Sequence, residues 1–569
     1  MPITLKCYAN CDDVFLIWHP DGHADGAIPG CLGFCVEVKK PDGSIEVLHN
    51  LRGFAADQPR TGETRPTDTW PLQTYTWTDH TILAGSSVQF RVTAMTGQPG
   101  KLQRGETSDW SELQTLSPRA GSHTSAFFNR GMILSQFVSR YAKEHQLTTA
   151  KALKANLKSD VDSPLMQFLS GELGKAIRGI LKGARDNPDL EVYCALFELD
   201  LDDLIDGLAA LGGRAHVVLG NGSAKSVDDD VNAAAAARLE GRVDLHRRMS
   251  APKGLAHNKF VVVCDKGKPF GVWTGSTNWS MTGLHTQINN GIAVVDDTLA
   301  QWYLDHWKAL RDAGDAFPAS LTAPNAQARG PAPINSQGRA RVWFTPMASG
   351  KDAKNGGADI DDLTRLVDQA QEGILFVMFM PGQEPLGSIL KRQEGGLYAR
   401  GVVSTLPMGT QDKRTNTYQL MTGQGYKPYK LDVVQPQGAT AIGDFLDEFS
   451  RQEFLQGMGF AITHSKVIVI DPFGAKPVVI TGSHNLSASA SKKNDENLLV
   501  IENCPELARA YAVNCMSVYQ HYRFPAAQHD SAKLRQQGKD AHAGFLRVDD
   551  GWQTKLKNPD TVADMKFWG

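Results

Sequence analysis

The chain has 569 residues, too many for one ordinary hydrophobic core, and 41% of them are hydrophobic against 21% charged, as in soluble globular proteins. The net charge of −3 gives no overall attraction to nucleic acids or anionic membranes. The first residues lack the basic and apolar segments of a secretory signal, and there is no run of about 18 apolar residues that would span a membrane. We therefore expect a cytoplasmic protein of several domains, and we leave export by a signal-independent route open.

Residues 1–116 carry short stretches in which apolar and polar residues alternate, as in half-buried strands. Such stretches begin at Val14, Phe34 and Val88, and the turn residues 40–43 (Lys-Pro-Asp-Gly) follow the second of them. Short strands separated by turns predict a β-sandwich over this segment.

The landmarks of this segment resemble those of a fibronectin type III domain. Trp18 lies in an early strand, residues 85–92 read Gly-x4-Phe-x-Val, and residues 108–111 read Ser-Asp-Trp-Ser ahead of the last expected strand. One departure is Val88, which stands where such domains usually carry a tyrosine.

Four of the eight cysteines lie in the same segment, at positions 7, 11, 31 and 35. Their Cys-x3-Cys spacing is wider than the Cys-x2-Cys of common zinc sites. We therefore expect reduced cysteines packed in the sandwich, with zinc as the weaker alternative and without a dense disulfide framework.

After a polar linker at residues 117–125, helical and strand patterns alternate. The expected elements are helices at 127–141, 166–182 and 204–211 and strands at 192–197 and 215–219. A strand–helix–strand unit of this spacing predicts a parallel sheet. We assign residues 126–320 to this first α/β domain.

Two groups of charged residues lie close to the expected strands of this domain. Glu198 and Asp200 follow the strand at 192–197, and we expect them at a solvated edge, with a place in the site as the alternative. Arg247 and Arg248 read as an exposed basic pair, with phosphate steering as the alternative.

A segment rich in Pro, Gly, Ala and Asn at residues 321–340 reads as a linker, after which the pattern restarts. The expected elements are a helix at 363–370, strands at 373–379 and 401–404, and a helix or lid-like segment at 444–454. Residues 340–524 are therefore assigned to a second α/β domain.

The remaining apolar and aromatic groups have structural explanations. Met378, Phe379 and Met380 are expected to pack in a core, with contact to acyl chains as the alternative. Residues 525–569 form a polar C-terminal tail, and we expect its three aromatic residues to dock onto the body. These are Trp552, Phe567 and Trp568.

The strongest functional signal is a series of polar residues in the second α/β domain. It runs His464-x-Lys466-x4-Asp471, then Gly482-Ser483-His484-Asn485, then Glu496. His464 and Lys466 share one face of a predicted strand and lie about 7 Å apart along it. An imidazole beside an ammonium suits a phosphate, because one can attack phosphorus while the other holds a non-bridging oxygen. Glu496 can accept from the second imidazole nitrogen and fix its tautomer.

The same series occurs in the first α/β domain. His257-x-Lys259 is followed by Gly275-Ser276-Thr277-Asn278. In both copies 21 residues separate the histidine from the asparagine. Equal spacing of a multi-part motif indicates an internal duplication.

Both copies resemble the His-Lys-Asp motif of the phospholipase D superfamily, over residues 127 to about 524. The resemblance implies two α/β halves about a pseudo-twofold axis, with one active site at their interface and one motif from each half. The expected fold is therefore multidomain, an N-terminal β-sandwich followed by these two halves. The resemblance also implies that one histidine forms a phosphohistidine, while the other protonates the leaving oxygen and then activates water, without a metal or another cofactor.

The first copy departs from the family pattern at two positions. Cys264 takes the place of Asp471, and Asp265 is one residue out of register, which on a strand places its side chain on the opposite face. Asn289 stands where the second copy has Glu496. An amide oxygen still accepts from an imidazole, but it carries no charge to stabilise an imidazolium.

The expected catalytic residues comprise both motifs with their supporting groups. They are His257, Lys259, Asn278, His464, Lys466, Asp471, Asn485 and Glu496, and the phosphate is bound by Lys259, Lys466, Ser276 and Ser483. We assign His257 as nucleophile and His464 as general acid, because the first histidine commonly attacks in relatives with two motifs. Glu496 favours the opposite assignment of the two roles. If it contacts the second-copy histidine, it makes that imidazole the more basic of the two.

The substrate class stays open between a phospholipid, whose phosphatidyl group is hydrolysed or transferred, and the DNA or RNA backbone, which presents the same phosphodiester. A phospholipid is preferred, because near-neutral charge disfavours binding to long duplexes. A third reading is a catalytically weak protein that recognises phosphate, to which the altered first motif gives weight. The sequence does not define an oligomeric state.

Overall fold

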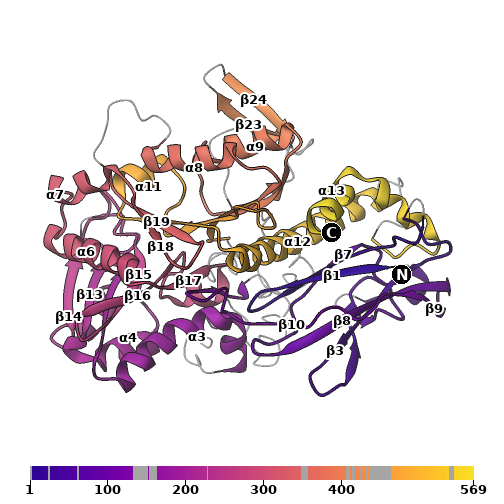
Figure 1. The fold of residues 1–569 in the computed structure, drawn as a ribbon, viewed down its shortest axis with the longest axis horizontal. Coiled ribbons are helices and arrows are strands. Elements are labelled where there is room, and N and C mark those ends of the chain that lie inside the picture. The colour runs from indigo at the N-terminus through magenta and orange to yellow at the C-terminus, as the bar shows by residue number, and fades with distance from the viewer. Residues whose placement is uncertain are drawn as a thin grey trace. The chain divides into compact units, whose positions relative to one another are not determined.

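The computed structural model describes residues 3–23, 26–60, 63–131, 152, 163–226, 228–347, 356–404, 411–412, 417–422, 425–430, 433–434, 463–536 and 544–569. These residues belong to two compact units, one formed by Met1–Ser117 with Gln520–Gly569 and the other by Pro118–Tyr519. The two ends of the chain, indigo and yellow in Figure 1, are thus both part of the first unit. The predicted helix beyond Gly131 and the predicted segment 444–454 lie outside the described residues.

The first unit contains two antiparallel sheets with one core between them. One sheet has the order β1 (Thr4–Ala9), β2 (Val14–His19), β7 (Thr76–Asp79); the other has the order β10 (Gln114–Thr115), β8 (Ser87–Gln98), β3 (Gly33–Lys39), β4 (Ile45–Val47), with β9 (Lys101–Thr107) also paired to β8. Alternate residues of β2, β3 and β8 are buried in a shared cluster that includes Leu16, Val36 and Phe90. Two sheets that enclose a shared core are typical of a β-sandwich. The resemblance to a fibronectin type III domain stays a prediction.

The C-terminal segment completes this core. It forms the 3-10 helix η7 (Asp550–Lys557) and the helix α13 (Pro559–Trp568). Trp552 stacks on Tyr75 with ring centroids 5.2 Å apart and donates from Nε1 to the carbonyl of Cys31 at 2.8 Å. Trp568 packs on Phe15 at 4.5 Å. The tail aromatics therefore dock as the sequence predicts, on the sandwich.

The cysteines of the sandwich are free thiols in separate surroundings. Cys31 donates to the carbonyl of Gly33, and burial raises the pKa of the Cys31 and Cys35 thiols to about 11. Within the described residues, no group of three or more His, Cys, Asp or Glu side chains is placed to hold a metal ion.

The first sheet of the second unit has seven strands. Their order is β11 (Thr124–Phe128), β17 (Asn290–Val295), β16 (Lys268–Gly275), β15 (Lys259–Asp265), β12 (Leu190–Leu196), β13 (Ala215–Gly220), β14 (Asp244–Arg248). The predicted parallel pair is confirmed, since β12 runs parallel to β13, but β15 joins β12 antiparallel and makes the sheet mixed. Phe127 and Phe128, expected in a helix, end the strand β11.

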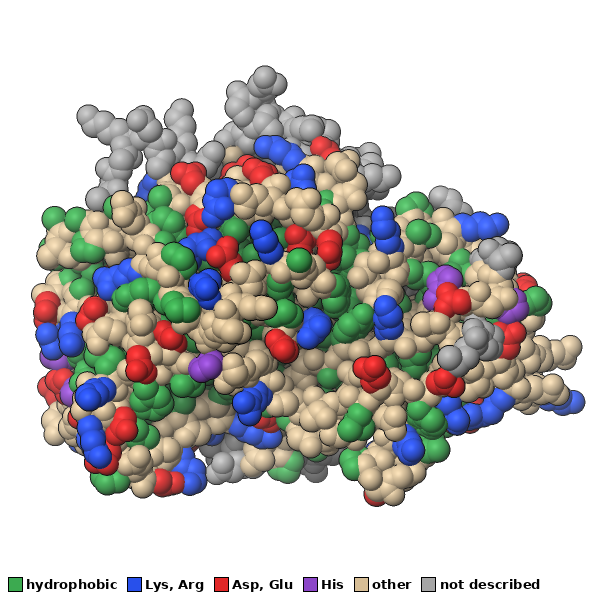
Figure 2. Space-filling model, viewed as in Figure 1, with side chains coloured by type: hydrophobic (Ala, Val, Ile, Leu, Met, Phe, Trp, Pro, Cys, Tyr) green, Lys and Arg blue, Asp and Glu red, His purple; other side chains and the backbone are tan. Residues whose placement is uncertain are grey.

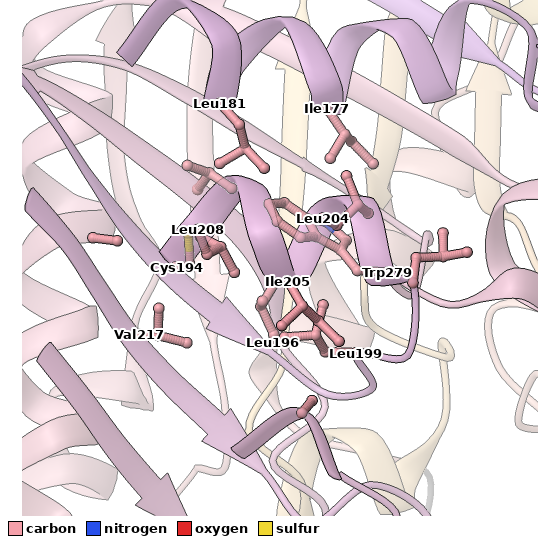
Figure 3. Packing of buried hydrophobic residues seen from close by; sticks show 14 of the residues in the cluster. Ile177, Leu181, Cys194, Leu196, Leu199, Leu204, Ile205, Leu208, Val217 and Trp279 are labelled. Carbon is pink, nitrogen blue, oxygen red and sulfur yellow. The ribbon is translucent and has the colours of Figure 1, made fainter. Parts of the chain in front are cut away.

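Helices cover both faces of this sheet. On one face, α3 (Pro164–Asp186) and α4 (Asp202–Ala209) bury their apolar residues against the strands, and Figure 3 shows Ile177 and Leu204 in this cluster with Val217 of β13. On the other face, α6 (Asp297–Ala313) packs across the sheet, and Trp307 donates to the carbonyl of Cys194 at 2.9 Å.

The second sheet repeats the order and directions of the first. Its strands are β18 (Arg329–Pro333), β19 (Arg339–Phe344), β28 (Asn497–Glu502), β27 (Val478–Gly482), β26 (Lys466–Ile470), β20 (Gly373–Met378), β21 (Tyr398–Val403) and β25 (Val433–Val434). β20 runs parallel to β21 and antiparallel to β26, as β12 does to β13 and β15. The helices α8 (Ala358–Asp368) and α9 (Leu386–Glu394) pack on it. The segment 321–340, expected to be a linker, contains β18.

The surface agrees with the near-neutral charge of the chain. On the face in Figure 2, the basic and acidic side chains of the described residues are intermixed. No helix within the described residues has the length and apolar character that crossing a membrane requires.

The docking of the tail predicts a stability effect. Replacing Trp552 by alanine removes a buried ring that fills the sandwich core, and we expect it to lower the free energy of unfolding by about 3 kcal/mol. Val562→Ala, on the exposed side of α13 where Val562 is 49% accessible, is the matched control and should change it by less than about 0.5 kcal/mol. Urea unfolding followed by tryptophan fluorescence compares the two variants, and equal effects would contradict a structural role for the tail.

Candidate active site

The first motif lies where β15 begins. Lys259, the first residue of the strand, pairs in register with Leu196 of β12, so that Phe197 comes beside the motif. The rings of Phe197 and His257 lie 4.6 Å apart, and Lys259 Nζ is 4.7 Å from the Phe197 centroid. Lys259 Nζ also donates to the carbonyl of His257 at 2.6 Å. Histidine and lysine thus share one face, as the strand periodicity predicts.

The second motif is built in the same way. Lys466 begins β26, pairs with Met378 and brings Phe379 beside His464, with ring centroids 4.8 Å apart. Lys466 Nζ lies 4.9 Å from the Phe379 centroid and donates to the carbonyl of His464 at 2.5 Å. The repeated phenylalanine was missed from the sequence, although its place at the end of the matching strand in both halves was a detectable signal.

Each histidine is held by the other half. His257 Nδ1 is 2.7 Å from Glu496 Oε2, and His464 Nδ1 is 2.9 Å from Asn289 Oδ1. Glu496 therefore does not hold the second-copy histidine, and the prediction from the sequence that it contacts this histidine is wrong. The reason is that Glu496 immediately precedes β28, where the chain meets the first half, as the hydrogen bond from Asp495 N to the Leu255 carbonyl shows.

The two serines do not present their hydroxyls to a free phosphate site. Ser276 Oγ donates to Asn289 Oδ1 at 2.7 Å, and Ser483 Oγ donates to Glu496 Oε2 at 2.8 Å. Each serine also accepts from a backbone N–H of the following strand. In the structure the two serines orient Asn289 and Glu496, the groups that hold the histidines. From the sequence we expected them to bind the phosphate.

The two motif asparagines have unequal surroundings. Asn278 Nδ2 donates to Glu198 Oε2 at 3.0 Å, and its buried Oδ1 has no hydrogen-bond partner among the residues that the structure describes. The same holds, within the described part of the chain, for the buried Oδ1 of Asn485. The expectation that Glu198 occupies a solvated edge is therefore wrong, since its carboxylate contacts a motif residue.

Asp471 lies away from the histidines, at the opposite end of β26. Its carboxylate accepts three backbone N–H groups, from Gln371 at 2.9 Å, Glu372 at 2.7 Å and Gly373 at 2.9 Å. It therefore ties the start of β20 to the end of β26. In the first half, Cys264 is buried and Asp265 is exposed beyond an irregularity in the register of β15.

A buried polar interface joins the halves around the motifs. Asn290 Nδ2 donates to Thr481 Oγ1 at 2.7 Å, and Thr274 Oγ1 donates to Asn497 Oδ1 at 2.8 Å. Tyrosines from two helices, α6 and α12 (Pro505–Gln536), add bonds to the same two asparagines. These contacts are reciprocal, because the asparagine of each half bonds to the threonine of the other half.

Burial dominates the electrostatics of the site. It lowers the pKa of His257 to about 4, against the opposing effect of Glu496, and lowers the pKa of Lys259 to about 7. Burial and the neighbouring lysines lower the pKa of His464 well below its usual value. Although burial raises the pKa of Glu496, His257 and Lys259 hold it below its ordinary value. Neutral imidazoles beside a carboxylate and two amines result, an arrangement suited to an anionic substrate.

The two arginines before the first motif make internal ion pairs. Arg247 binds Asp230 through two contacts of 2.9 and 3.0 Å. Arg248 is 1% exposed and pairs with the equally buried Asp495, with Nη2 3.0 Å from Oδ1. Neither the exposed pair nor the phosphate steering considered from the sequence is present. Arg248 instead fixes the segment that carries Glu496.

A known protein family matches the part of the chain that contains the second motif. Residues 363–516 match the family described as cardiolipin synthase, PLD-like domain. This range contains β20, β26, β27 and β28 with the second motif. The coarser part of the sequence prediction, a phospholipase D-like domain, is therefore supported.

Individual relatives match short parts of the chain. A phospholipase D of Rickettsia bellii is 52% identical over 56 residues, 10% of this chain and 25% of that protein, and one of Rickettsia conorii is 48% identical over 56 residues, 10% of this chain and 26% of that protein. The chain thus matches about a quarter of the length of these curated relatives.

Solved structures match larger parts of the chain at low identity. The match to phosphatidylserine synthase of Haemophilus influenzae covers 66% of this chain and 94% of that chain, at 14% identity and a TM-score of 0.39. The phospholipase D family member Nuc of Salmonella typhimurium covers 32% of this chain and 96% of its own at 18% identity and a TM-score of 0.20.

The place of Asp471 predicts a separation between stability and chemistry. Asp471→Ala leaves three backbone N–H groups without their acceptor, and we expect the free energy of unfolding to fall by about 2 kcal/mol. Chemical denaturation measures this loss, and the exposed Asp265→Ala should leave the midpoint unchanged. A large loss of activity in the folded Asp471→Ala protein, with stability intact, would contradict this assignment.

Proposed function

We propose that the protein is a phosphodiesterase of the phospholipase D type, which acts on a phospholipid through a covalent phosphohistidine. The observation that carries the proposal is the reciprocal pairing of His257 with Glu496 and of His464 with Asn289. Because both pairings use Nδ1, each ring is left with Nε2 to meet a substrate. The same contacts support a pseudo-twofold relation between the halves proposed at 126–320 and 340–524, with β18 added to the second.

The two histidines differ in the charge of their partners, and this difference assigns their roles. Glu496 stabilises positive charge on His257, which forms when Nε2 attacks phosphorus. Asn289 holds His464 without a negative charge, so that its proton is released more readily. His257 is therefore the nucleophile and His464 the general acid.

The reaction then follows two balanced steps. In the first, His464 reacts as the imidazolium, a form that the negative charge of the bound diester favours against the effect of burial. The His257 Nε2–phosphorus bond forms as the bond from phosphorus to the leaving oxygen breaks, and that oxygen takes the proton of His464 Nε2, which leaves His464 neutral with its Nδ1–H on Asn289. In the second, His464 accepts a proton from water, or from an alcohol if the group is transferred, as the oxygen attacks phosphorus and His257 leaves. Lys259 and Lys466 face the non-bridging oxygens, whose negative charge favours the protonated amines.

Three features support a lipid over a nucleic acid as substrate. The family that matches residues 363–516 is described as cardiolipin synthase, and the Rickettsia relatives are named phospholipase D. The net charge of −3 disfavours the binding of a long polyanion. Met380, next to the Phe379 that contacts His464, is 47% exposed and offers an apolar contact at the second motif.

The first test is substrate cleavage by the full chain in the presence of EDTA. We expect hydrolysis of phospholipid vesicles without added metal, and a loss of about 100-fold to 10,000-fold in His257→Ala and His464→Ala. Single- and double-stranded DNA and RNA are offered in parallel, and cleavage of these alone would make the protein a nuclease. If the wild type and both variants are equally inert on every substrate, the protein only recognises phosphate. Cleavage that requires a divalent ion contradicts the proposed mechanism.

The second test assigns the two histidines. Bis(p-nitrophenyl) phosphate carries a leaving group that needs little protonation, so His464→Ala should form the intermediate and release it slowly. We expect acid-labile phosphate on His257 after rapid quenching and mass spectrometry of peptides. His257→Ala is the matched control and should stay unlabelled. Label on His464 in the His257→Ala protein would reverse the two roles.

A further inference from the structure

The two halves differ at one position beside the motif lysines. Strand pairing aligns Leu196 with Lys259 and Met378 with Lys466, so the second residues beyond these strand ends, Glu198 and Met380, are counterparts. A second register agrees, since Asp200 N donates to the Trp279 carbonyl as Gly382 N donates to the Leu486 carbonyl. A carboxylate in the first half thus replaces an exposed thioether in the second.

Glu198 is firmly held at this place. Its Oε2 accepts from Asn278 Nδ2 at 3.0 Å and its Oε1 from Ser223 Oγ at 3.3 Å. The backbone carbonyl of Glu198 accepts from Trp279 N at 3.0 Å. The following carboxylate, Asp200, accepts from Met281 N at 2.8 Å, so the segment is fixed on both sides of Trp279.

The contact with Asn278 has a chemical consequence. Burial raises the pKa of Glu198, and Lys259 with the hydrogen bonds from Ser223 and Asn278 opposes this rise and favours the carboxylate. Because the carboxylate only accepts, Asn278 presents its amide nitrogen to Glu198. This fixes the orientation of the amide and leaves the second N–H of Nδ2 for a phosphoryl oxygen. At the equivalent place beside Asn485 the second half has Met380, whose thioether cannot anchor an amide N–H in the same way.

Lys259 lies close to Glu198, because its Nζ is 4.7 Å from the ring centroid of the adjacent Phe197. Burial lowers the pKa of Lys259 to about 7, and the carboxylates of Glu496 and Glu198 both oppose this effect. For Lys466, burial and Lys259 lower the pKa well below its usual value, and Glu496 opposes them. The first half thereby keeps the more readily protonated amine.

We propose that Glu198 is a positioning residue of the first motif, which orients Asn278 and serves as a charge partner of Lys259 so that the first half holds the phosphoryl group during transfer. The proposal deepens the phosphodiesterase function above and rests on it for the substrate. It assigns the two halves unequal tasks, since the first motif holds the phosphoryl oxygens more strongly than Lys466 of the second does, and the leaving group is released at the second.

The test uses two substitutions in the full chain. Glu198→Gln keeps the shape and a carbonyl acceptor for Asn278 but removes the charge, while Glu198→Met copies the second half. Since the carboxylate raises the pKa of Lys259, its removal should shift the alkaline limb of kcat/KM for bis(p-nitrophenyl) phosphate to lower pH by about one unit. Glu198→Met should also lose the orientation of Asn278 and lower kcat/KM by about 10-fold to 100-fold. Glu240→Gln, at an exposed carboxylate of the same half outside the site, is the matched control and should leave the pH profile unchanged.

A second readout keeps this inference separate from the proposed function. Lysine ammonium groups are titrated by NMR in protein labelled at the lysine ε-carbon, with the Lys259→Arg variant to assign the signal. We expect Lys259 to titrate at lower pH in Glu198→Gln than in the wild type. An unchanged titration overturns the role of Glu198, whether or not a substrate is cleaved. A wild type that cleaves no diester, together with a shifted titration, would refute the proposed function and retain the charge partnership.

Discussion

The site depends on two hydrogen bonds that cross between the α/β halves. Neither half contains a complete histidine site, because the group that orients each ring comes from the other half. The crossing bonds are buried, and the asparagines and threonines around them are buried as well. Buried polar groups of this kind are costly unless every member finds its partner, which makes the relative placement of the halves specific. The hydrogen bonds that orient the histidines therefore also hold the two halves together.

Within this near-symmetric frame, the differences between the copies carry the chemical information. Glu496 occupies the position that Asn289 has in the first copy, and Glu198 the position that Met380 has in the second copy. Both acidic residues contact the first motif, Glu496 through His257 and Glu198 through Asn278. In the proposed mechanism, such point differences separate the group that attacks from the group that donates a proton. The replacement of Asp471 by Cys264 in the first copy does not affect the histidines in this way. Asp471 ties the start of β20 to the end of β26, away from the histidines.

Much of this arrangement could be predicted from the sequence, and the failures have a common cause. The strand beneath each motif and the shared face of His464 and Lys466 follow from local periodicity, and the repeat of the strand order follows from equal spacing. The partner of Glu496 could not be predicted from the sequence. Closeness in the sequence favours His464 of the same copy, whereas the fold places Glu496 beside His257 of the other copy. The serines and Glu198 were misjudged for the same reason, since their partners are set by tertiary packing.

The first unit is discontinuous in the chain, since residues near both ends build it and the second unit is inserted between them. During synthesis, the sandwich strands emerge before the α/β unit, whereas Trp552 and Trp568 emerge after it. The α/β unit is then synthesised while the sandwich still exposes the apolar surface that these rings cover. Docking of the tail thus follows synthesis of the α/β unit, and a chain truncated before Trp552 would retain its site residues yet expose a surface prone to aggregation.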